Sequence, residues 1–149
     1  MNSDFKDLLR LFADNQVRYL VVGGYAVIRY TEPRYTKDLD LWVEATPENS
    51  SRCYRALAAF GAPLGDIQPF DLVQEGYVFQ MGVPPNRVDL LMNVRGLVFQ
   101  EAWSRRVVID VEGLQLPILC KEDVITSKIA SGRPQDLIDV ELLRQTEQL

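Results

Sequence analysis

Histidine is absent from the 149-residue sequence, and cysteine occurs only as Cys53 and Cys120. Without histidine, any general base must be a carboxylate or a metal-bound hydroxide, and Ser-His-Asp or Cys-His catalysis is excluded. Two cysteines make neither a disulfide framework nor a CxxC metal site. We therefore expect both thiols to be reduced and to have a structural role.

The sequence also lacks an excess of basic residues and any apolar run of the roughly 20 residues that span a bilayer. Sixteen basic and 21 acidic residues give a net charge of −5, which argues against a protein that coats nucleic acid with its whole surface. The first residues, which include Asp4, Lys6 and Asp7, do not have the layout of a signal peptide. We expect a cytoplasmic protein without a membrane partner.

With 47% hydrophobic residues, a chain of this length buries one core, which predicts a single domain over residues 1–149. Apolar periodicity, glycines and prolines predict alternating helices and strands. The expected helices are 3–14, 25–30, 47–60, 121–130 and 134–147, and the expected strands are 17–22, 37–44, 76–81, 86–92, 106–111 and 114–119. This order predicts an α+β fold, with a mixed central sheet flanked by helices and a C-terminal helical pair.

Two aspartates lie two positions apart in the segment 36–42, Thr-Lys-Asp-Leu-Asp-Leu-Trp. Because strand side chains alternate between faces, Asp38 and Asp40 point one way and Leu39 and Leu41 the other. Neighbouring carboxylates raise each other's pKa unless a cation neutralises them. Mg²⁺ suits this role, since it binds carboxylate oxygens together with phosphates and water. The alternative is an exposed edge strand with solvated acids.

A third aspartate, Asp89, lies in the apolar segment Arg-Val-Asp-Leu-Leu at 87–91. Without a partner, an acid in such surroundings would cost a few kcal/mol of desolvation. If this strand lies beside 37–44, Asp89 joins the other two acids, and three converging carboxylates suit two metal ions about 3.5–4 Å apart. The alternative is a salt bridge from Asp89 to Arg87 on the same face.

A glycine pair, Gly23 and Gly24, follows the apolar strand 17–22. Glycines between a strand and a helix let the backbone approach a ligand closely, and the N–H groups at the helix start can hold phosphate oxygens. A simple strand-to-helix connector is the alternative. The glycine pair gains weight from the aspartates that follow it.

Three ordered segments resemble the polymerase-beta-like nucleotidyltransferase superfamily: Val-Val-Gly-Gly-Tyr-Ala at 21–26, Thr-Lys-Asp-Leu-Asp-Leu at 36–41 and Arg-Val-Asp-Leu at 87–90. Within it, the sequence is similar to the small bacterial AbiEii-like group, which is associated with toxin–antitoxin systems. The segments Val-Ile-Thr-Ser-Lys-Ile-Ala and Gly-Arg-Pro-Gln-Asp-Leu, within 124–139, look like that group's helix-turn-helix. The resemblance extends over residues 17–142.

The resemblance implies a metal site and a triphosphate site. Asp38 and Asp40 would bind both ions, Mg²⁺ or Mn²⁺, and Asp89 would be the third ligand and the carboxylate on the base side. Gly23 and Gly24 would hold the triphosphate of the nucleoside triphosphate. The superfamily's usual Gly-Ser pair is Gly-Gly here, which removes a hydroxyl that would bind the terminal phosphates.

The resemblance also assigns roles outside the strands. Lys128 would reach the nucleotide phosphates, and Asp136 would fix the nucleotide or that lysine. The residues alone favour a surface lysine and an acid in the first turn of a helix. Arg34 and Lys37 would contact phosphate or an acceptor, with a solvated loop as the equal alternative.

The expected reaction is transfer of a nucleoside monophosphate from a nucleoside triphosphate to a hydroxyl, with release of pyrophosphate. The acceptor is the 3′ end of a transfer RNA, a tyrosine or serine of a protein, or a small molecule such as an aminoglycoside. A cognate toxin or antitoxin, or a second copy in a homodimer, would complete the site. The alternatives are a catalytically inactive nucleotidyltransferase-like module that binds a partner, and a simple nucleotide-binding or structural domain.

Overall fold

A six-stranded mixed sheet forms the centre of the molecule in the computed structural model, which describes residues 1–31, 38–83 and 86–146. The strands lie in the order β3-β4-β2-β1-β6-β5. In chain order they are β1 (Tyr19–Val22), β2 (Asp38–Val43), β3 (Val78–Met81), β4 (Arg87–Leu91), β5 (Val107–Val111) and β6 (Leu114–Ile118). Pairing is parallel between β2 and β4 and between β1 and β6, and antiparallel elsewhere.

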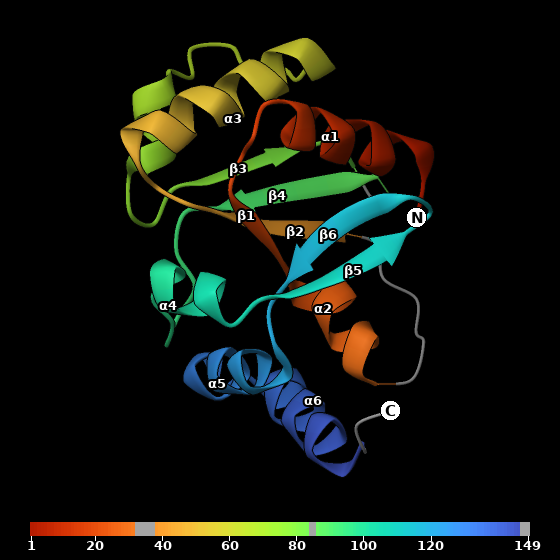
Figure 1. Ribbon diagram of the computed structural model, residues 1–149. Helices are drawn as coiled ribbons and strands as arrows, with labels where there is room; N and C mark the ends of the chain where they lie inside the picture. Colours follow the sequence, from red (N-terminus) through yellow and green to blue (C-terminus); the bar gives the residue numbers. More distant parts are fainter. Residues whose placement is uncertain (32–37, 84–85, 147–149) are drawn as a thin grey trace.

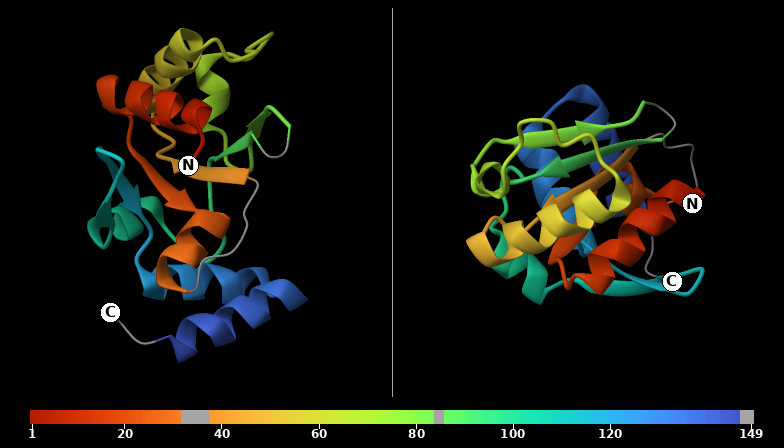
Figure 2. Two further views of the ribbon diagram at one scale, coloured as in Figure 1. Left: turned by 90° about the vertical axis from the view of Figure 1, so that its right-hand side faces the viewer. Right: turned by 90° about the horizontal axis from the view of Figure 1, so that it is seen from above.

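Helices cover the sheet from two sides (Figures 1 and 2). Helices α1 and α3 pack against each other on one side, and α2, α5 and α6 gather on the other. The helices are α1 (Ser3–Asp14), α2 (Gly23–Tyr30), α3 (Pro47–Phe60), α4 (Phe99–Ser104), α5 (Lys121–Ser131) and α6 (Pro134–Gln145), with a 3₁₀ turn η1 (Pro69–Val73). The α+β fold expected from the sequence is confirmed.

Local sequence explains where these helices begin and end. The Thr46 hydroxyl accepts a hydrogen bond from the Asn49 N–H at 3.3 Å, and Pro47 occupies the first turn of α3, where a missing N–H costs nothing. Gly61 ends that helix with φ +87°, which a residue with a side chain adopts at a cost. Sequence patterns did not predict the short elements η1 and α4. Helix α4 has no side-chain cap, whereas η1 has Pro69 in its first turn and a hydrogen bond of 2.9 Å from the Gln68 N–H to Asp71.

The hydrophobic core lies between the sheet and the pair α1 and α3. Leu39 and Leu41 of β2 are fully buried in it, whereas Asp38 and Asp40 alternate with them and face the other side. Cys53 and Cys120 are buried free thiols, and burial raises the pKa of Cys53 to about 12. The core thus holds β2 in a register that leaves its two acids facing α2 and α5.

None of the helices in the described part of the chain is both long enough and apolar enough to cross a bilayer.

Candidate active site

Strand pairing brings the three aspartates of the sequence motifs together at the centre of the sheet. In the parallel pairing of β2 with β4, Asp40 lies opposite Asp89, and Asp38 lies opposite Arg87. Period-two alternation puts Asp38, Asp40, Arg87 and Asp89 on one face. Three carboxylates therefore share this face with one guanidinium.

The environment of Asp40 disfavours negative charge, and one oxygen of Asp38 lacks a partner among the described residues. Burial, followed by the charges of Asp89 and Asp38, raises the pKa of Asp40 to about 6. The buried Oδ1 atom of Asp38 has no hydrogen-bond partner among the described residues. A buried carboxylate oxygen without a partner is costly, and a bound cation would remove that cost. These two side chains fit a divalent metal ion by their chemistry and by their unmet charge.

Arg87 binds the third aspartate on both oxygens. Its Nε and Nη2 atoms each donate to Asp89 at 2.9 Å, and its Nε atom lies 4.0 Å from Asp38 Oδ2. The salt bridge left open by the sequence is therefore present, and the pKa of Arg87 is raised by it. A carboxylate accepts about four hydrogen bonds, so Asp89 keeps acceptor positions for another ligand.

As the side chains stand, no group of three histidine, cysteine, aspartate or glutamate residues in the described ranges has the arrangement of a complete metal site. Both oxygens of Asp89 accept hydrogen bonds from the Arg87 guanidinium. Asp38 and Asp40 make up the part of the site that remains open to a cation.

Gly23 lies directly against these acids. The antiparallel pairing of β1 with β2 places Val22 opposite Asp40, so the chain enters α2 beside the Asp40 carboxylate. A Cβ atom on Gly23 would overlap Asp40 Oδ2 and lie 2.9 Å from its Cγ, and the residue has φ +67°. Only glycine satisfies both the conformation and the close approach. Gly24 follows within the first turn of α2, which has no side-chain cap on its N–H groups.

Lys128 of α5 joins two acids of α6 that are almost completely buried. Its Nζ atom lies 3.2 Å from Asp136 Oδ1 and 3.1 Å from Asp139 Oδ2. Hydrogen bonds from Arg133, followed by those from Lys128, lower the pKa of Asp136 to about 2. Asp136 is thus an ion-pair partner of Lys128, and the roles that the resemblance implied for both residues stay predictions. Sequence patterns missed Asp139 as a second partner.

A cleft of about 210 Å³ connects the sheet with the helical pair. Its lining residues come from β1 and the start of α2, from β2, from the end of β4, and from α5 and α6. They are Val22, Gly23, Asp40, Leu91, Val94, Ser127, Lys128, Ser131, Arg133 and Asp136. Predicted site residues that lie far apart in the sequence, Gly23, Asp40, Lys128 and Asp136, therefore line one space, whereas Gly24, Asp38 and Asp89 are not among its lining residues. Leu91 was not singled out from the sequence, although alternation from Asp89 indicates that it lies on the same face.

Two predicted contacts fall outside the described residues. Arg34 and Lys37, proposed for phosphate or acceptor binding, belong to the segment 32–37, so they stay predictions.

The sequence matches, over residues 3–147, the family described as "Nucleotidyltransferase of unknown function (DUF6036)". The chain belongs to this nucleotidyltransferase family. The superfamily expected from the sequence is confirmed at this level, whereas membership of the AbiEii-like group stays a prediction. No curated protein matches the sequence.

Solved structures of nucleotidyltransferases share the fold of this family member. The lincosamide antibiotic adenylyltransferase LnuA, solved with lincomycin bound, superposes with a TM-score of 0.60 at 17% identity, covering 97% of each chain. ANT(2'')-Ia in complex with adenylyl-2''-tobramycin superposes with a TM-score of 0.61 at 14% identity, covering 93% of this chain and 84% of that one. The solution structure of the antibiotic-resistance factor ANT(2'')-Ia has a TM-score of 0.61 at 12% identity, over 95% and 80% of the two chains.

Proposed function

We propose that this family member transfers a nucleoside monophosphate from a nucleoside triphosphate to a hydroxyl, with Mg²⁺ or Mn²⁺ as cofactor. The observation that carries the proposal is the Asp40–Asp89 register of β2 and β4, with Asp38 Oδ1 buried and without a described partner. Asp38 and Asp40 would hold the metal ions, with Asp89 as third ligand. Bound there, the ions would neutralise charge on the phosphates and favour ionisation of the acceptor hydroxyl.

The polar groups around the cleft suit a triphosphate. The N–H groups at the start of α2 are free of side-chain caps, and Gly23 allows phosphate oxygens to come close to the backbone. Lys128 has three donor positions and uses two of them on Asp136 and Asp139, so its third would be available to a phosphate without the loss of either partner. The side chains of this region would orient the pyrophosphate leaving group.

Proton removal from the acceptor requires a carboxylate or a metal-bound hydroxide, because the chain has no histidine. Asp89 lies on the outer strand of the three-carboxylate group, away from Gly23 and Lys128, and would face the acceptor side. Arg87 would hold the Asp89 carboxylate in a fixed orientation through its two hydrogen bonds.

The test incubates purified protein with each α-labelled nucleoside triphosphate, Mg²⁺ or Mn²⁺, and in separate reactions total RNA, total protein and a panel of small hydroxyl compounds. We expect label on one acceptor and none with Asp38→Ala. Asp66→Ala, which changes an exposed acid outside the site, serves as the matched control. Labelling that survives in Asp38→Ala would show that the proposed metal site is wrong.

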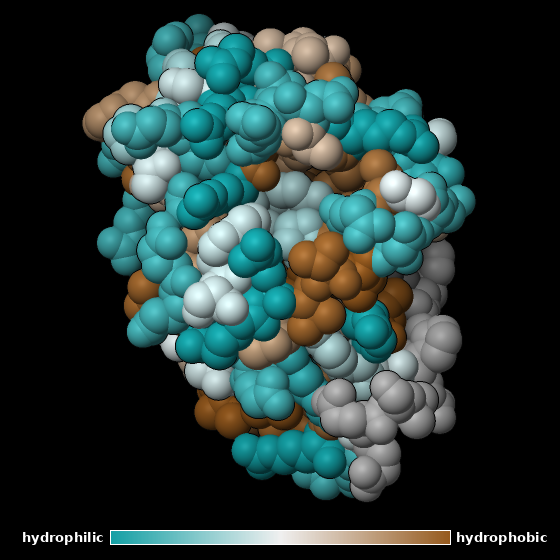
Figure 3. All heavy atoms as spheres, viewed as in Figure 1, coloured by the Kyte–Doolittle hydropathy of each residue, from teal (hydrophilic) through white to brown (hydrophobic). Residues whose placement is uncertain are grey.

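One feature favours a partner-binding module instead. Helix α6 carries exposed apolar side chains, and Figure 3 shows brown surface over this region as well as over β5. Leu137, Ile138 and Leu142 are 53%, 55% and 43% exposed. Apolar patches of this kind are typical of surfaces that bind another chain. Two results together would favour this function. Light scattering would show a homodimer that is lost in Leu142→Glu, and the protein would show neither nucleotide transfer nor metal-dependent stabilisation by nucleotide.

A further inference from the structure

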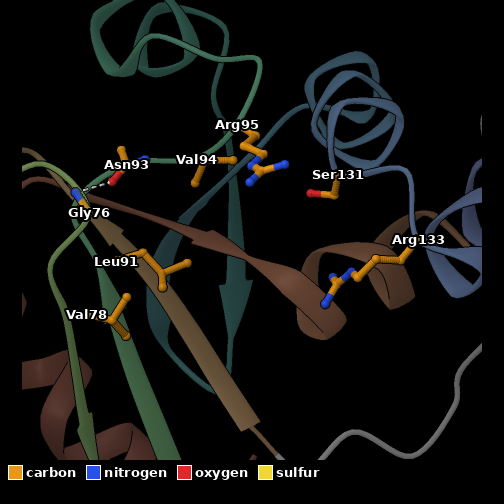
Figure 4. Close-up of a pocket in the computed structure, with 8 residues that line it drawn as sticks. All are labelled: Gly76, Val78, Leu91, Asn93, Val94, Arg95, Ser131 and Arg133. Carbon is orange, nitrogen blue, oxygen red and sulfur yellow. Dashed lines mark hydrogen bonds between the residues drawn. The ribbon is translucent and has the colours of Figure 1, made fainter.

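A second, larger pocket of about 660 Å³ adjoins the cleft and shares Leu91, Val94, Ser131 and Arg133 with it. Its floor is the ends of β3 and β4, and its walls are the loop after β4 and the α5–α6 connection (Figure 4). A pocket of this volume accommodates a small organic molecule. The proposed triphosphate site does not use it.

The position of this pocket relative to the carboxylates indicates what enters it. Gly23 and Lys128 lie on the side of Asp40 where β1 and α5 are. Leu91 lies on β4, the strand of Asp89, and Val78 lies on β3, the next strand in the sheet. In phosphoryl transfer the attacking and leaving oxygens are roughly in line, on opposite sides of the phosphorus. If pyrophosphate leaves toward Lys128, the acceptor approaches from the side of β3 and β4.

The charge of the pocket is positive. Of the described residues that line it, two are arginines and none is acidic. Arg133 is neutralised by Asp136, to which it donates at 2.7 Å, whereas Arg95 is exposed and has no ion-pair partner among the described residues. In Figure 4 the Arg95 side chain extends into the space between its own loop and Ser131. Arg95 is therefore the uncompensated positive charge of this pocket.

The backbone around Arg95 is shaped by a tight turn. The Leu97 N–H donates to the Val94 carbonyl at 3.3 Å, and Gly96 has φ +82°, as the third position of a type II turn requires. A Cβ on Gly96 would lie 3.0 Å from the Ala130 Cβ atom, so the turn is seated against α5. This packing holds Arg95 over the pocket instead of leaving it on a projecting loop.

The opposite wall and the floor are less polar. The Asn93 side chain accepts a hydrogen bond from the Gly76 N–H at 2.7 Å, which joins the loop after β4 to the loop before β3 (Figure 4). Val78, Leu91 and Val94 give an apolar surface between that wall and Arg95. The pocket thus offers one cationic group beside a patch suited to a carbon skeleton.

Resting on the proposed function, we infer that the acceptor is a small hydroxyl compound with a phosphate or carboxylate group, and that Arg95 binds this anionic group. A polycationic acceptor would meet the uncompensated charge of Arg95 with like charge, which disfavours binding. An arginine binds phosphate and carboxylate through two parallel hydrogen bonds, which fixes orientation as well as affinity.

The experiment uses matched acceptors that differ only in charge: glucose 6-phosphate, glucose and glucosamine, and glycerol 3-phosphate and glycerol, with a panel of hydroxy acids. Tobramycin and total RNA are included for comparison. Each is incubated with the full chain, Mg²⁺ and α-labelled nucleoside triphosphates. We expect label on phosphorylated or carboxylated members, and little or none on neutral and cationic ones.

Variants of Arg95 separate acceptor binding from nucleotide binding. Arg95→Ala should raise the KM of the labelled acceptor about 10- to 100-fold, the ratio expected when a charged hydrogen bond is lost, and leave the KM of the nucleotide within about twofold. Arg95→Lys should recover part of the loss. Arg55→Ala, which removes an exposed arginine from α3, should change neither constant.

The outcomes distinguish the inference from the function. The inference would be overturned if tobramycin, neutral compounds or RNA were labelled, or if Arg95→Ala changed only the KM of the nucleotide. Either result would leave the proposed nucleotidyl transfer intact. Metal-dependent stabilisation by nucleotide with no small anionic acceptor labelled would also overturn it. Absence of both labelling and that stabilisation would overturn the proposed function itself.

Discussion

The described residues include two clusters of acids, one half-buried on the sheet and one buried between helices, and they differ in how their charge is balanced. On the sheet, Asp38, Asp40 and Asp89 face one guanidinium among the described residues, that of Arg87, and the pKa of Asp40 is raised to about 6. Between α5 and α6, Asp136 and Asp139 face Lys128 and Arg133, and the pKa of Asp136 is lowered to about 2. The raised pKa of Asp40 indicates that its carboxylate lacks a cation, whereas the lowered pKa of Asp136 indicates that its carboxylate already has cationic partners.

The sheet cluster has the charge balance of a binding site, and the helical cluster has that of a structural contact. The helical cluster is neutral within itself, so it stabilises the packing of α5 on α6 and orients Lys128. Counted over the described residues, the sheet cluster has more negative than positive charge, which lowers stability unless something positive binds. Proteins keep such deficits mainly at functional sites, where perturbed pKa values concentrate.

The largest effect is expected when the sheet cluster loses one of its carboxylates. Asp40→Asn should lower nucleotidyl transfer on the order of 10³-fold, because metal binding and its several kcal/mol of transition-state stabilisation are lost. The same change removes a charge that burial disfavours, so the melting temperature without metal should stay equal or rise. Transfer assays and thermal melting measure the two effects. A fall in both would indicate that Asp40 has a structural role instead.

Gly23→Ala should also act on the sheet cluster, by displacing the Asp40 carboxylate. The added Cβ would overlap Asp40 Oδ2 at φ +67°, so we expect a loss of about 3 kcal/mol in the free energy of unfolding. Gly65→Ala is the matched control, since Gly65 has φ +54° and nothing within 4 Å of an added Cβ. It should cost only about 1 kcal/mol, as measured by urea unfolding. Equal costs in both variants would show that the contact with Asp40 is unimportant.

Removing a member of the helical cluster should mainly lower the stability of the fold. Lys128→Met leaves Asp139 without its ammonium partner, and we expect a loss of about 2 kcal/mol, less than for a fully buried pair because Arg133 still binds Asp136. Affinity for nucleotide should fall as well. Lys6→Met removes an exposed salt bridge to Glu112 and should cost less than about 1 kcal/mol. If Lys128→Met were equally mild, the helical cluster would not stabilise the fold.

Sequence patterns were most informative where local chemistry decides the outcome. Period-two alternation placed Asp38 and Asp40 on one face of a strand, and Gly61 marked the end of α3, as found. The turn η1 and the short helix α4 were missed, since each is at most six residues long and shows too little apolar periodicity to be recognised.

Pairing between distant strands was the part of the site that was harder to predict from the sequence. The sequence left two partners open for Asp89, a metal site and Arg87. The structure shows both the register with Asp40 and the ion pair, because parallel pairing of β2 with β4 puts all these groups on one face. The pocket at Arg95 was not predicted at all, since it depends on a turn seated against α5.

The smallest expected effect is a pH dependence that distinguishes the two clusters. The folded pKa of Asp40, about 6, lies above the unfolded value of 3.8, so the folded chain binds this proton more tightly. Stability from Asp40 is therefore greatest at low pH and declines as the pH rises through 6, by about 1 kcal/mol between pH 5 and 7.5.

Asp136 behaves in the opposite way. Its folded pKa, about 2, lies below the unfolded value, so its stabilising effect is complete above pH 4 and is lost only as the pH falls toward 2. Thermal melting without divalent ions at pH 5 and 7.5 should thus report Asp40 and not Asp136. Asp40→Asn should flatten this dependence, and saturating Mg²⁺ should reduce it, since a bound cation removes the cost of ionising Asp40. A slope that is unchanged in Asp40→Asn would mean that the sheet cluster carries no deficit of positive charge.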